Sequence, residues 1–285
     1  MQFSQTLSSL QKTINQEIER FFKLRINQAD SSFEKKVLAW LLEYSLRKAK
    51  RLRAILVYSG YLLAGGKNKG AILKTAIFIE LIHNYLLLHD DILDQDDLRR
   101  GKTSFHRLHG INEAIVAGDQ ICALGYDILV SAPFSEKAKI LSLEKLNKTL
   151  YNTCSGQLLE FDFKNKSKSG KKIKDRELLE VYKKKTAFYT LVAPLQIGAL
   201  LTGAKEPFLK KIEKFALPLG IAFQIRDDLI DGDIERTFGL NKEKYKTMQV
   251  KLINQSKSIL KSEKSFSARE KDFLLNLADY CKFND

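Results

Sequence analysis

The sequence has few of the residues that break or cross-link a chain. Its 285 residues include 4 Pro, 15 Gly and 3 Cys. So few Pro and Gly are atypical of a protein built from strands and turns, and the long apolar-periodic stretches between them predict an all-α protein. The three cysteines, Cys122, Cys154 and Cys281, are widely spaced and form no C-x-x-C pair. This spacing argues against a disulfide framework or a zinc site and favours a reducing, cytoplasmic location.

No stretch has the pattern of an export signal or a membrane span. The N-terminus lacks a basic region followed by an apolar run. The longest uncharged stretch, residues 187–204, is interrupted by Pro194 and carries Gln196, so it predicts a buried core helix. We therefore expect a single domain over residues 1–285 with no transmembrane segment.

The charge balance is basic, with 48 Lys+Arg against 34 Asp+Glu and a formal net charge of +14. Nucleic acid, an acidic membrane surface or small polyanions are the partners that such a balance suits. No nucleic-acid motif is present, so we expect no nucleic-acid partner. Scattered lysines at 164–174 and 242–264 predict a solvated surface.

Helical periodicity also predicts secondary structure outside the charged motifs. Apolar spacing predicts amphipathic helices over residues 1–27 and 33–47. The Lys-, Ser- and Gly-containing stretch 164–172 predicts a flexible loop, and residues 182–186 are expected to open the next helix.

An acidic cluster follows an apolar helical run. Asp90, Asp91 and Asp94 stand three and four residues apart and so share one helix face. Such carboxylates repel one another unless a hard cation binds them, and oxygen-only ligands suit Mg²⁺. The alternative is a solvated acidic helix end.

The same spacing recurs more than a hundred residues later. Asp227, Asp228 and Asp231 follow an apolar stretch at 215–223. Carboxylates from facing helices of a bundle can build a metal site. Because Mg²⁺ completes its shell with water and substrate phosphates, a magnesium-bridged diphosphate is the ligand to expect.

Basic residues flank the acidic motifs. Lys48 to Arg53 carries four positive charges in six residues, which suits a phosphate group. A solvated basic face is the alternative. His83 precedes Asp90 by two helical turns, and the neighbours Arg99 and Arg100 follow the first cluster. Adjacent helical residues diverge, so we expect the two arginines to serve different sites.

With these motifs the sequence resembles the trans-isoprenyl (polyprenyl) diphosphate synthases of the short-chain type. Residues 89–102 (HDDILDQDDLRRGK) are similar to the first aspartate-rich motif of that family, and residues 223–231 (FQIRDDLID) to the second. The resemblance runs from about residue 50 to residue 246. It implies the isoprenoid synthase fold, a helical bundle around a central cavity. It also implies a magnesium-dependent prenyltransferase that condenses isopentenyl diphosphate with an allylic diphosphate.

The resemblance also implies roles for individual residues. Three Mg²⁺ ions would be bound by Asp90, Asp94, Asp227 and Asp231, and the catalytic residues would be Asp90, Asp91, Asp94, Asp227, Asp228, Lys185, Thr186 and Gln224. Isopentenyl diphosphate would be bound by Lys50, Arg51, His83 and Arg100. The allylic diphosphate would be bound by Arg99, Lys185 and Lys246. Thr186 and Gln224 would offer their oxygens to the developing carbocation.

The sequence departs from the family pattern at several positions. Ala49 and Ala54 replace a Gly and a Pro of the basic motif, and Glu160 replaces an Asp. The loop after Asp231 lacks a Lys, and Lys246 is taken to match the later loop Lys. The shortened loop keeps open a non-catalytic or regulatory subunit of a heteromeric synthase. A terpene cyclase is the other alternative, although a cyclase needs no isopentenyl site.

Two residues before the first motif predict the product length. Tyr85 and Leu86 lie about one helical turn before Asp90, where the resemblance places the floor under the growing chain. A bulky Tyr85 implies products of C15 to C20, with geranylgeranyl diphosphate the first expectation and farnesyl diphosphate the second. The family also implies a homodimer.

Overall fold

The structure is a computed structural model that describes residues 2–169 and 173–283. These residues are almost entirely helical, which confirms the all-α prediction. The elements, in order, are α1 (Gln2–Gln28), α2 (Ser32–Leu46), α3 (Leu52–Leu63), α4 (Lys69–Leu93), β1 (Leu98–Arg99), β2 (Lys102–Thr103), α5 (Phe105–His109), α6 (Ile111–Val130), α7 (Glu136–Lys168), α8 (Asp175–Val181), the π-helix η1 (Tyr182–Val192), α9 (Ala193–Leu200), α10 (Glu206–Asp231), α11 (Asp233–Arg236), α12 (Lys242–Ser262) and α13 (Ala268–Tyr280).

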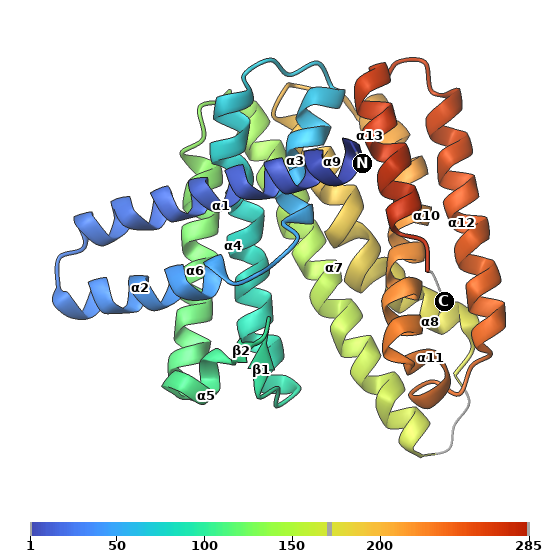
Figure 1. Cartoon of the computed structure of the whole chain (residues 1–285), viewed down its shortest axis with the longest axis horizontal. Coiled ribbons are helices and arrows are strands. Elements are labelled where there is room, and N and C mark those ends of the chain that lie inside the picture. Colours follow the sequence, from blue (N-terminus) through green and yellow to red (C-terminus); the bar gives the residue numbers. More distant parts are fainter. Residues whose placement is uncertain (1, 170–172, 284–285) are drawn as a thin grey trace. The chain divides into compact units, whose positions relative to one another are not determined.

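The helices group into two compact units (Figure 1). The first unit comprises Met1–Tyr58 and Asn68–Phe134, and the second comprises Ser59–Lys67 and Ser135–Asp285. Each unit carries one of the two acidic motifs and is described by itself.

Helix α4 is the centre of the first unit. Its first turn is capped by the Asn68 side chain, which accepts from the backbone N–H of Ala71 at 3.0 Å. Helices α1, α2 and α6 pack against α4 (Figure 1). By length and composition α4 is apolar enough to cross a membrane, and 61% of its apolar window is buried. This burial is typical of the core helix of a compact unit, and it explains why α4 is apolar on nearly all sides.

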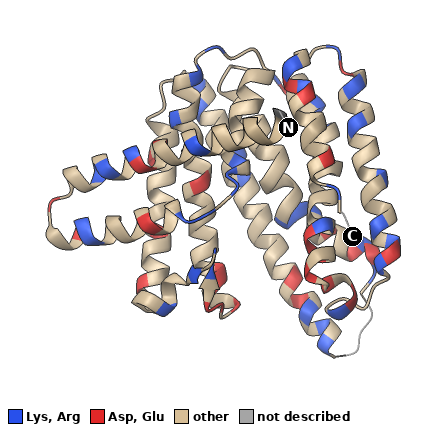
Figure 2. Cartoon of the chain, viewed as in Figure 1, with Lys and Arg blue, Asp and Glu red and all other residues tan. Residues whose placement is uncertain are grey.

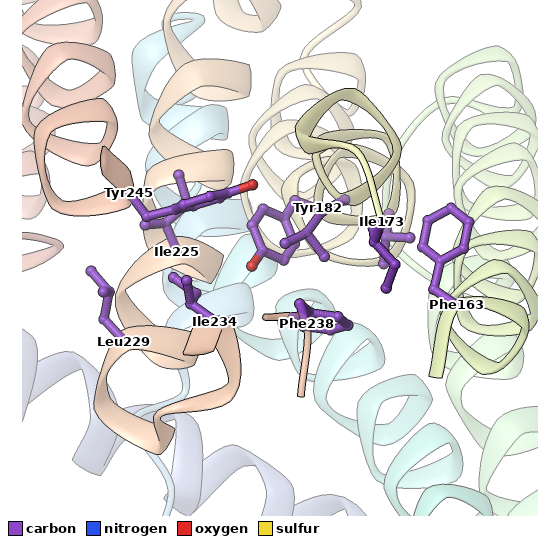
Figure 3. Packing of buried hydrophobic residues seen from close by; sticks show 10 residues of the cluster. Phe163, Ile173, Tyr182, Ile225, Leu229, Ile234, Phe238 and Tyr245 are labelled. Atoms are coloured by element: carbon purple, nitrogen blue, oxygen red, sulfur yellow. The ribbon is translucent and has the colours of Figure 1, made fainter. Parts of the chain in front are cut away.

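The second unit is built from long helices. Helix α10 packs against η1 and α12, and α7 packs against η1 and α9. Helix α10 ends at Gly232, whose φ of 74° is the left-handed conformation that favours glycine after a helix. Beneath that end lies an apolar cluster (Figure 3). It contains Phe163, Ile173, Tyr182, Ile225, Leu229, Ile234, Phe238 and Tyr245.

The predicted helices over 1–27 and 33–47 are confirmed by α1 and α2, and the buried core helix predicted at 187–204 by η1 and α9. The loop predicted at 164–172 is wrong for residues 164–168, which continue α7. Ion pairs one turn apart support this extension, Lys164 to Glu160 at 3.1 Å and Lys166 to Asp162 at 2.6 Å. Residues 170–172 lie outside the described residues.

Candidate active site

The first acidic motif closes α4, and its middle carboxylate points inward. Asp91 is fully buried; it accepts from the Tyr44 hydroxyl at 3.3 Å and from Arg99 Nε at 2.5 Å. Burial raises the pKa of Asp91 above its usual value, against the lowering effect of Arg99. Asp90 is half-buried and Asp94 is exposed. Two of the three carboxylates therefore remain toward the outside of the unit.

Arg99 and Arg100 lie in a tight hairpin and not in the helix predicted from the sequence. Arg99 ends strand β1, and Arg100 is the first residue of the turn. Strands β1 and β2 pair with Leu98 opposite Thr103, and the two residues between them are Arg100 (φ 56°) and Gly101 (φ 77°). Positive φ at both central residues is the signature of a type I′ turn, which favours glycine at both places. An arginine held in this conformation is strained, and such strain concentrates at functional sites. Arg99 pairs with Asp91, whereas Arg100 lies on the turn itself.

Arg51 forms the buried centre of the basic motif. Arg51 is 1% exposed, and its guanidinium pairs with Glu80 at 3.4 Å. It also donates to Asn15 Oδ1 at 2.7 Å and to the carbonyls of Ser45 and Arg47 at 2.5 and 3.1 Å. Its φ of 56° is again left-handed. These contacts tie the loop between α2 and α3 to α4.

A cluster of like charges surrounds His83. Burial, and then the charges of Arg53 and Arg100, lower the pKa of His83 well below its usual value. Burial and the nearby Arg51 lower the pKa of Arg100 to about 10. Arg100 Nη1 is buried and has no hydrogen-bond partner within the part of the chain that the structure describes. At neutral pH the cluster therefore holds a neutral imidazole beside crowded cations, an arrangement that a bound anion would stabilise.

The second acidic motif also turns its middle carboxylate inward. Asp228 is 7% exposed and accepts from the Tyr182 hydroxyl at 2.5 Å and from Gln224 Nε2 at 2.6 Å. Thr186 Oγ1 donates to Gln224 Oε1 at 2.6 Å, which completes a chain of four polar side chains. Burial, opposed by these hydrogen bonds, raises the pKa of Asp228 to about 6. Asp227 is half-buried and Asp231 is exposed.

The ring of Tyr182 lies among the apolar side chains at the end of α10 (Figure 3). Acidic residues, red in Figure 2, follow the end of α4 and recur around the end of α10 and α11. The inward aspartates, Asp91 and Asp228, thus each have a tyrosine partner, and the outer aspartates of each motif supply the surface charge.

Lys185, on the π-helix η1, forms an ion pair with α7. It pairs with Glu160, which also binds Lys164 at 3.1 Å. Burial alone would raise the pKa of Glu160, but the two lysines outweigh it and hold that pKa below its usual value. A cavity of about 20 Å³, room for one water molecule, lies among Glu160, Lys185 and Asp228.

The π-helix η1 sets the position of Lys185 and Thr186. π-helical segments are rare and occur mostly at functional sites. A Cβ on Gly156 of α7 would meet the backbone nitrogen of Lys185 at 2.6 Å, so only glycine permits this close approach. Lys246, on α12, pairs with Glu243 at 3.3 Å and lies over the Phe283 ring at 5.4 Å.

The polyprenyl synthetase family model matches residues 35–243, nearly three quarters of the chain. The chain belongs to this family. It is 38% identical over 184 residues to a geranylgeranyl diphosphate synthase of Methanosarcina mazei, covering 64% of this chain and 54% of that protein. It is 32% identical over 241 residues to the farnesyl diphosphate synthase of Escherichia coli, covering 81% of this chain and 76% of that protein. Several of the curated relatives are matched over only about half of their length.

The solved structures show the same fold. A geranylgeranyl pyrophosphate synthetase from the archaeon Geoglobus acetivorans superposes with a TM-score of 0.82 at 25% identity, covering 96% of this chain and 98% of that one. The prediction of the isoprenoid synthase fold and of the polyprenyl synthetase family is therefore confirmed.

The acidic motifs suit a magnesium ion that binds together with a phosphate group. Among the described residues no group of three or more His, Cys, Asp and Glu side chains is arranged to hold a metal ion. The inward turn of Asp91 and Asp228 explains this, because each motif keeps only two outer carboxylates. Mg²⁺ needs no more than one or two carboxylates when water and substrate phosphates complete its shell, so the donor set fits that ion.

Within this family frame, each unit gathers part of the predicted site. The first unit brings together His83 and Arg100, and separately Asp91 and Arg99. The second unit brings Lys185, Thr186, Gln224 and Asp228 into one cluster.

Other predicted residues lie at the margins of these clusters. Lys50 is exposed, and Tyr85 and Leu86 are half-buried; the Tyr85 ring stands edge-on to His89 with centroids 4.8 Å apart. The roles assigned to these residues stay predictions.

Tyr44, Tyr182 and Glu80 are the residues that sequence reasoning missed, whereas Arg53 was predicted only as part of the basic motif. Arg53 stands in the basic motif, so its charge was the available signal, and its effect on the pKa of His83 places it in that cluster. Nothing in the spacing marks either tyrosine, because its partner lies tens of residues away in the sequence.

Proposed function

We propose that the protein is a magnesium-dependent prenyltransferase that condenses isopentenyl diphosphate with an allylic diphosphate. The expected product is a trans-prenyl diphosphate of C15 to C20, geranylgeranyl diphosphate first. The observation that carries the proposal is the repeated motif. In each copy a tyrosine holds the middle aspartate inside, while the first and third aspartates stay half-buried or exposed. The names of the relatives, geranylgeranyl and farnesyl diphosphate synthases, support the reaction class.

The proposed magnesium ligands are Asp90 on α4, Asp94 at its C-cap, and Asp227 and Asp231 on α10. When bound, magnesium would act as a Lewis acid that neutralises the charge of the allylic diphosphate. Lys185, Arg99 and Lys246 would add charge-assisted hydrogen bonds to the same diphosphate.

The cation cluster around His83 is the proposed site of isopentenyl diphosphate. Lys50, Arg53 and Arg100 would supply positive charge, and the neutral His83 would donate one hydrogen bond. The lowered pKa of Arg100 supports this assignment, because a diphosphate would stabilise a cation that burial and neighbouring charge disfavour. The resemblance also assigns Arg51 to this substrate, but its guanidinium already donates to Glu80, Asn15 and two carbonyls. Its proposed part is to hold the motif in place.

Departure of the diphosphate would leave an allylic cation that must be shielded from water. Thr186 and Gln224 are proposed to place their oxygens near this cation, and their mutual hydrogen bond at 2.6 Å fixes both side chains. The double bond of isopentenyl diphosphate would then attack. The released diphosphate can accept the proton, so this scheme requires no separate base from the protein.

Tyr85 and Leu86 are proposed to limit the length of the product. Both precede Asp90 on α4 by about one turn and are half-buried. Replacing the Tyr85 ring by alanine would then lengthen the product.

We also propose a soluble, cytoplasmic homodimer. Its support is the exposed apolar side chains on α7, where Tyr151 is 74% and Leu158 68% exposed. A second copy of the chain would cover these side chains and remove them from water.

The test is to incubate the purified protein with Mg²⁺, isopentenyl diphosphate and each allylic primer in turn, and to separate the products by chromatography. Extension to C15 or C20 supports the proposal, and Tyr85→Ala should shift the distribution to longer chains. A cyclic hydrocarbon from an allylic diphosphate alone would indicate a terpene cyclase. No product with any primer, with product restored only by a second protein, would indicate a non-catalytic subunit.

A further inference from the structure

The second unit contains a hollow far along its helices from the acidic motif. Its volume is about 540 Å³, and it lies between the start of α7 and the start of α10. Four lysines line it: Lys137, Lys145, Lys148 and Lys205. We call it the lysine hollow.

The lysines of this hollow form no ion pairs in the part of the chain that the structure describes, although the charges of Glu213 and Glu206 act on Lys145. Within the described residues, none of the four ammonium groups lies within 4.0 Å of a carboxylate. Elsewhere in the same unit lysines commonly pair, as Lys211 does with Glu263 and Lys257 with Asp279. Glu144 and Glu206 also line the hollow, which leaves four lysines against two glutamates. Burial lowers the pKa of Lys145, and the charges of Glu213 and Glu206 only partly oppose this lowering.

Apolar side chains form the other part of the lining. Leu200 and Leu209 are 4% and 5% exposed, and Leu141 lies beside them on α7. Gly203, with a φ of 85° and no atom within 4 Å of a Cβ built on it, leaves space at the turn before α10. The hollow is therefore lined by leucines as well as lysines, and Leu141 is the most exposed of the three leucines, at 37%.

Two helix starts add to the positive potential. Ser135 caps α7 and Lys205 is the N-cap of α10, and both residues line the hollow. The N-terminal end of a long helix carries about half a positive charge. The same two helices carry Glu160 and Asp228 at about 36 Å and 33 Å from their starts, taking 1.5 Å per residue. The hollow is thus a separate place from the candidate active site.

We propose that the lysine hollow binds an amphiphilic anion, a phosphate or diphosphate head on a hydrocarbon chain. The head would lie among the four lysines, and the chain would cover Leu141, Leu200 and Leu209. A volume of about 540 Å³ lies in the range of small-molecule sites, roughly 300–1,000 Å³. The product of the proposed reaction has this chemistry, and so does a membrane phospholipid. Identifying the ligand with the product rests on the proposed function, whereas the binding itself does not.

The experiment is a calorimetric titration of the whole protein with farnesyl diphosphate in EDTA, which removes the metal that the proposed active site needs. The double variant Lys145→Glu/Lys148→Glu reverses two charges of the hollow. The control Lys210→Glu/Lys214→Glu reverses two exposed lysines of α10 that do not line it. We expect wild type and control to bind alike, and the hollow variant to bind at least tenfold more weakly. If the charge-reversed variant folds poorly, Lys145→Met/Lys148→Met replaces it. This variant keeps apolar side chains of similar length, and we expect it to lose less affinity for farnesyl diphosphate than the charge reversal would.

Two further ligands identify the chemistry and its source. Inorganic pyrophosphate should bind at least tenfold more weakly than farnesyl diphosphate, because it lacks the chain. Vesicles containing phosphatidylglycerol that sediment the wild type but not the hollow variant would assign the head to a lipid. Equal binding of farnesyl diphosphate by wild type and hollow variant, or binding of pyrophosphate as tight as that of farnesyl diphosphate, would overturn the proposal. If the protein binds farnesyl diphosphate in EDTA but forms no product from isopentenyl diphosphate and any primer, the proposed function is wrong and the proposed binding in the lysine hollow is unaffected.

Discussion

The hydroxyl of Tyr182 donates to the buried carboxylate of Asp228 at 2.5 Å. The first unit repeats the arrangement with Tyr44 and Asp91, at the longer distance of 3.3 Å. In both motifs the tyrosine gives the middle aspartate a partner inside the protein. The repeated DDxxD spacing thus serves two purposes in each copy, because one carboxylate anchors the helix end and two face outward.

Tyr182→Phe should weaken the protein more than Tyr44→Phe. Both changes delete a hydroxyl that donates to a buried carboxylate, and a hydrogen bond to a charged group contributes about 1.5–3 kcal/mol. Asp91 retains Arg99 as a partner, whereas Asp228 retains only the neutral Gln224 among the partners described here. Urea unfolding and steady-state turnover of the two variants provide the comparison. Equal effects of the two changes would contradict the structural role given to Tyr182.

Arg51 and Arg53 should separate stability from substrate binding. Arg51→Met leaves Glu80 buried without its ion-pair partner, which costs about 3–5 kcal/mol. Arg53→Met should change stability by no more than about 1 kcal/mol, and it should raise the KM for isopentenyl diphosphate at least tenfold. Urea unfolding and initial rates measure the two effects. If Arg51→Met raises the KM for isopentenyl diphosphate strongly while stability stays normal, Arg51 binds the substrate directly.

The sequence predicts the acidic motifs and the helices that carry them, because apolar periodicity and carboxylate spacing are local signals. It does not predict which basic residue of Lys50, Arg51 and Arg53 turns inward. That choice depends on Glu80 and Asn15, which lie 29 and 36 residues away from Arg51. Charge alone predicts solvent exposure for all three.

The same limit applies to backbone shape. The left-handed φ of Arg100 arises from the two-residue turn between β1 and β2, and an arginine at that position gives no composition signal for it. The π-helical path of η1 is likewise set by packing, since Gly156 of α7 meets the backbone of Lys185. Residues 164–168 continue a helix despite their loop-like composition because Glu160 and Asp162 stand one turn earlier.

The stability of the protein should depend on pH through His83. Its folded pKa lies well below the usual value of 6.5, so below pH 6.5 the unfolded chain takes up a proton that the folded one does not. Stability therefore falls as the pH falls from 6.5 toward the folded pKa, by up to about 1.4 kcal/mol per pH unit from this group. His83→Gln should remove that slope between pH 6.5 and 5. Urea midpoints measured across this range would contradict the account if the slopes of wild type and variant coincide.

Gly156→Ala should displace Lys185. The added Cβ would lie 2.6 Å from the Lys185 backbone nitrogen and 3.0 Å from its Cα, and neither backbone atom can give way cheaply. We expect destabilisation of about 1–3 kcal/mol from overpacking, with a raised KM for the allylic substrate. Gly70→Ala is the matched control, since its Cβ would find its nearest neighbour at 3.8 Å. Normal kinetics in Gly156→Ala would show that the position of Lys185 does not depend on this contact.

The most direct test of the central claim is the rate of isopentenyl incorporation in Asp90→Ala and Asp227→Ala, each compared with wild type at saturating Mg²⁺. Asp162→Ala, which removes an exposed aspartate of α7, is the control. We predict that each motif variant loses at least a thousandfold in turnover, about 4 kcal/mol, with its helical circular dichroism unchanged. Near-normal turnover in either motif variant would contradict the claim that both acidic motifs act on one diphosphate.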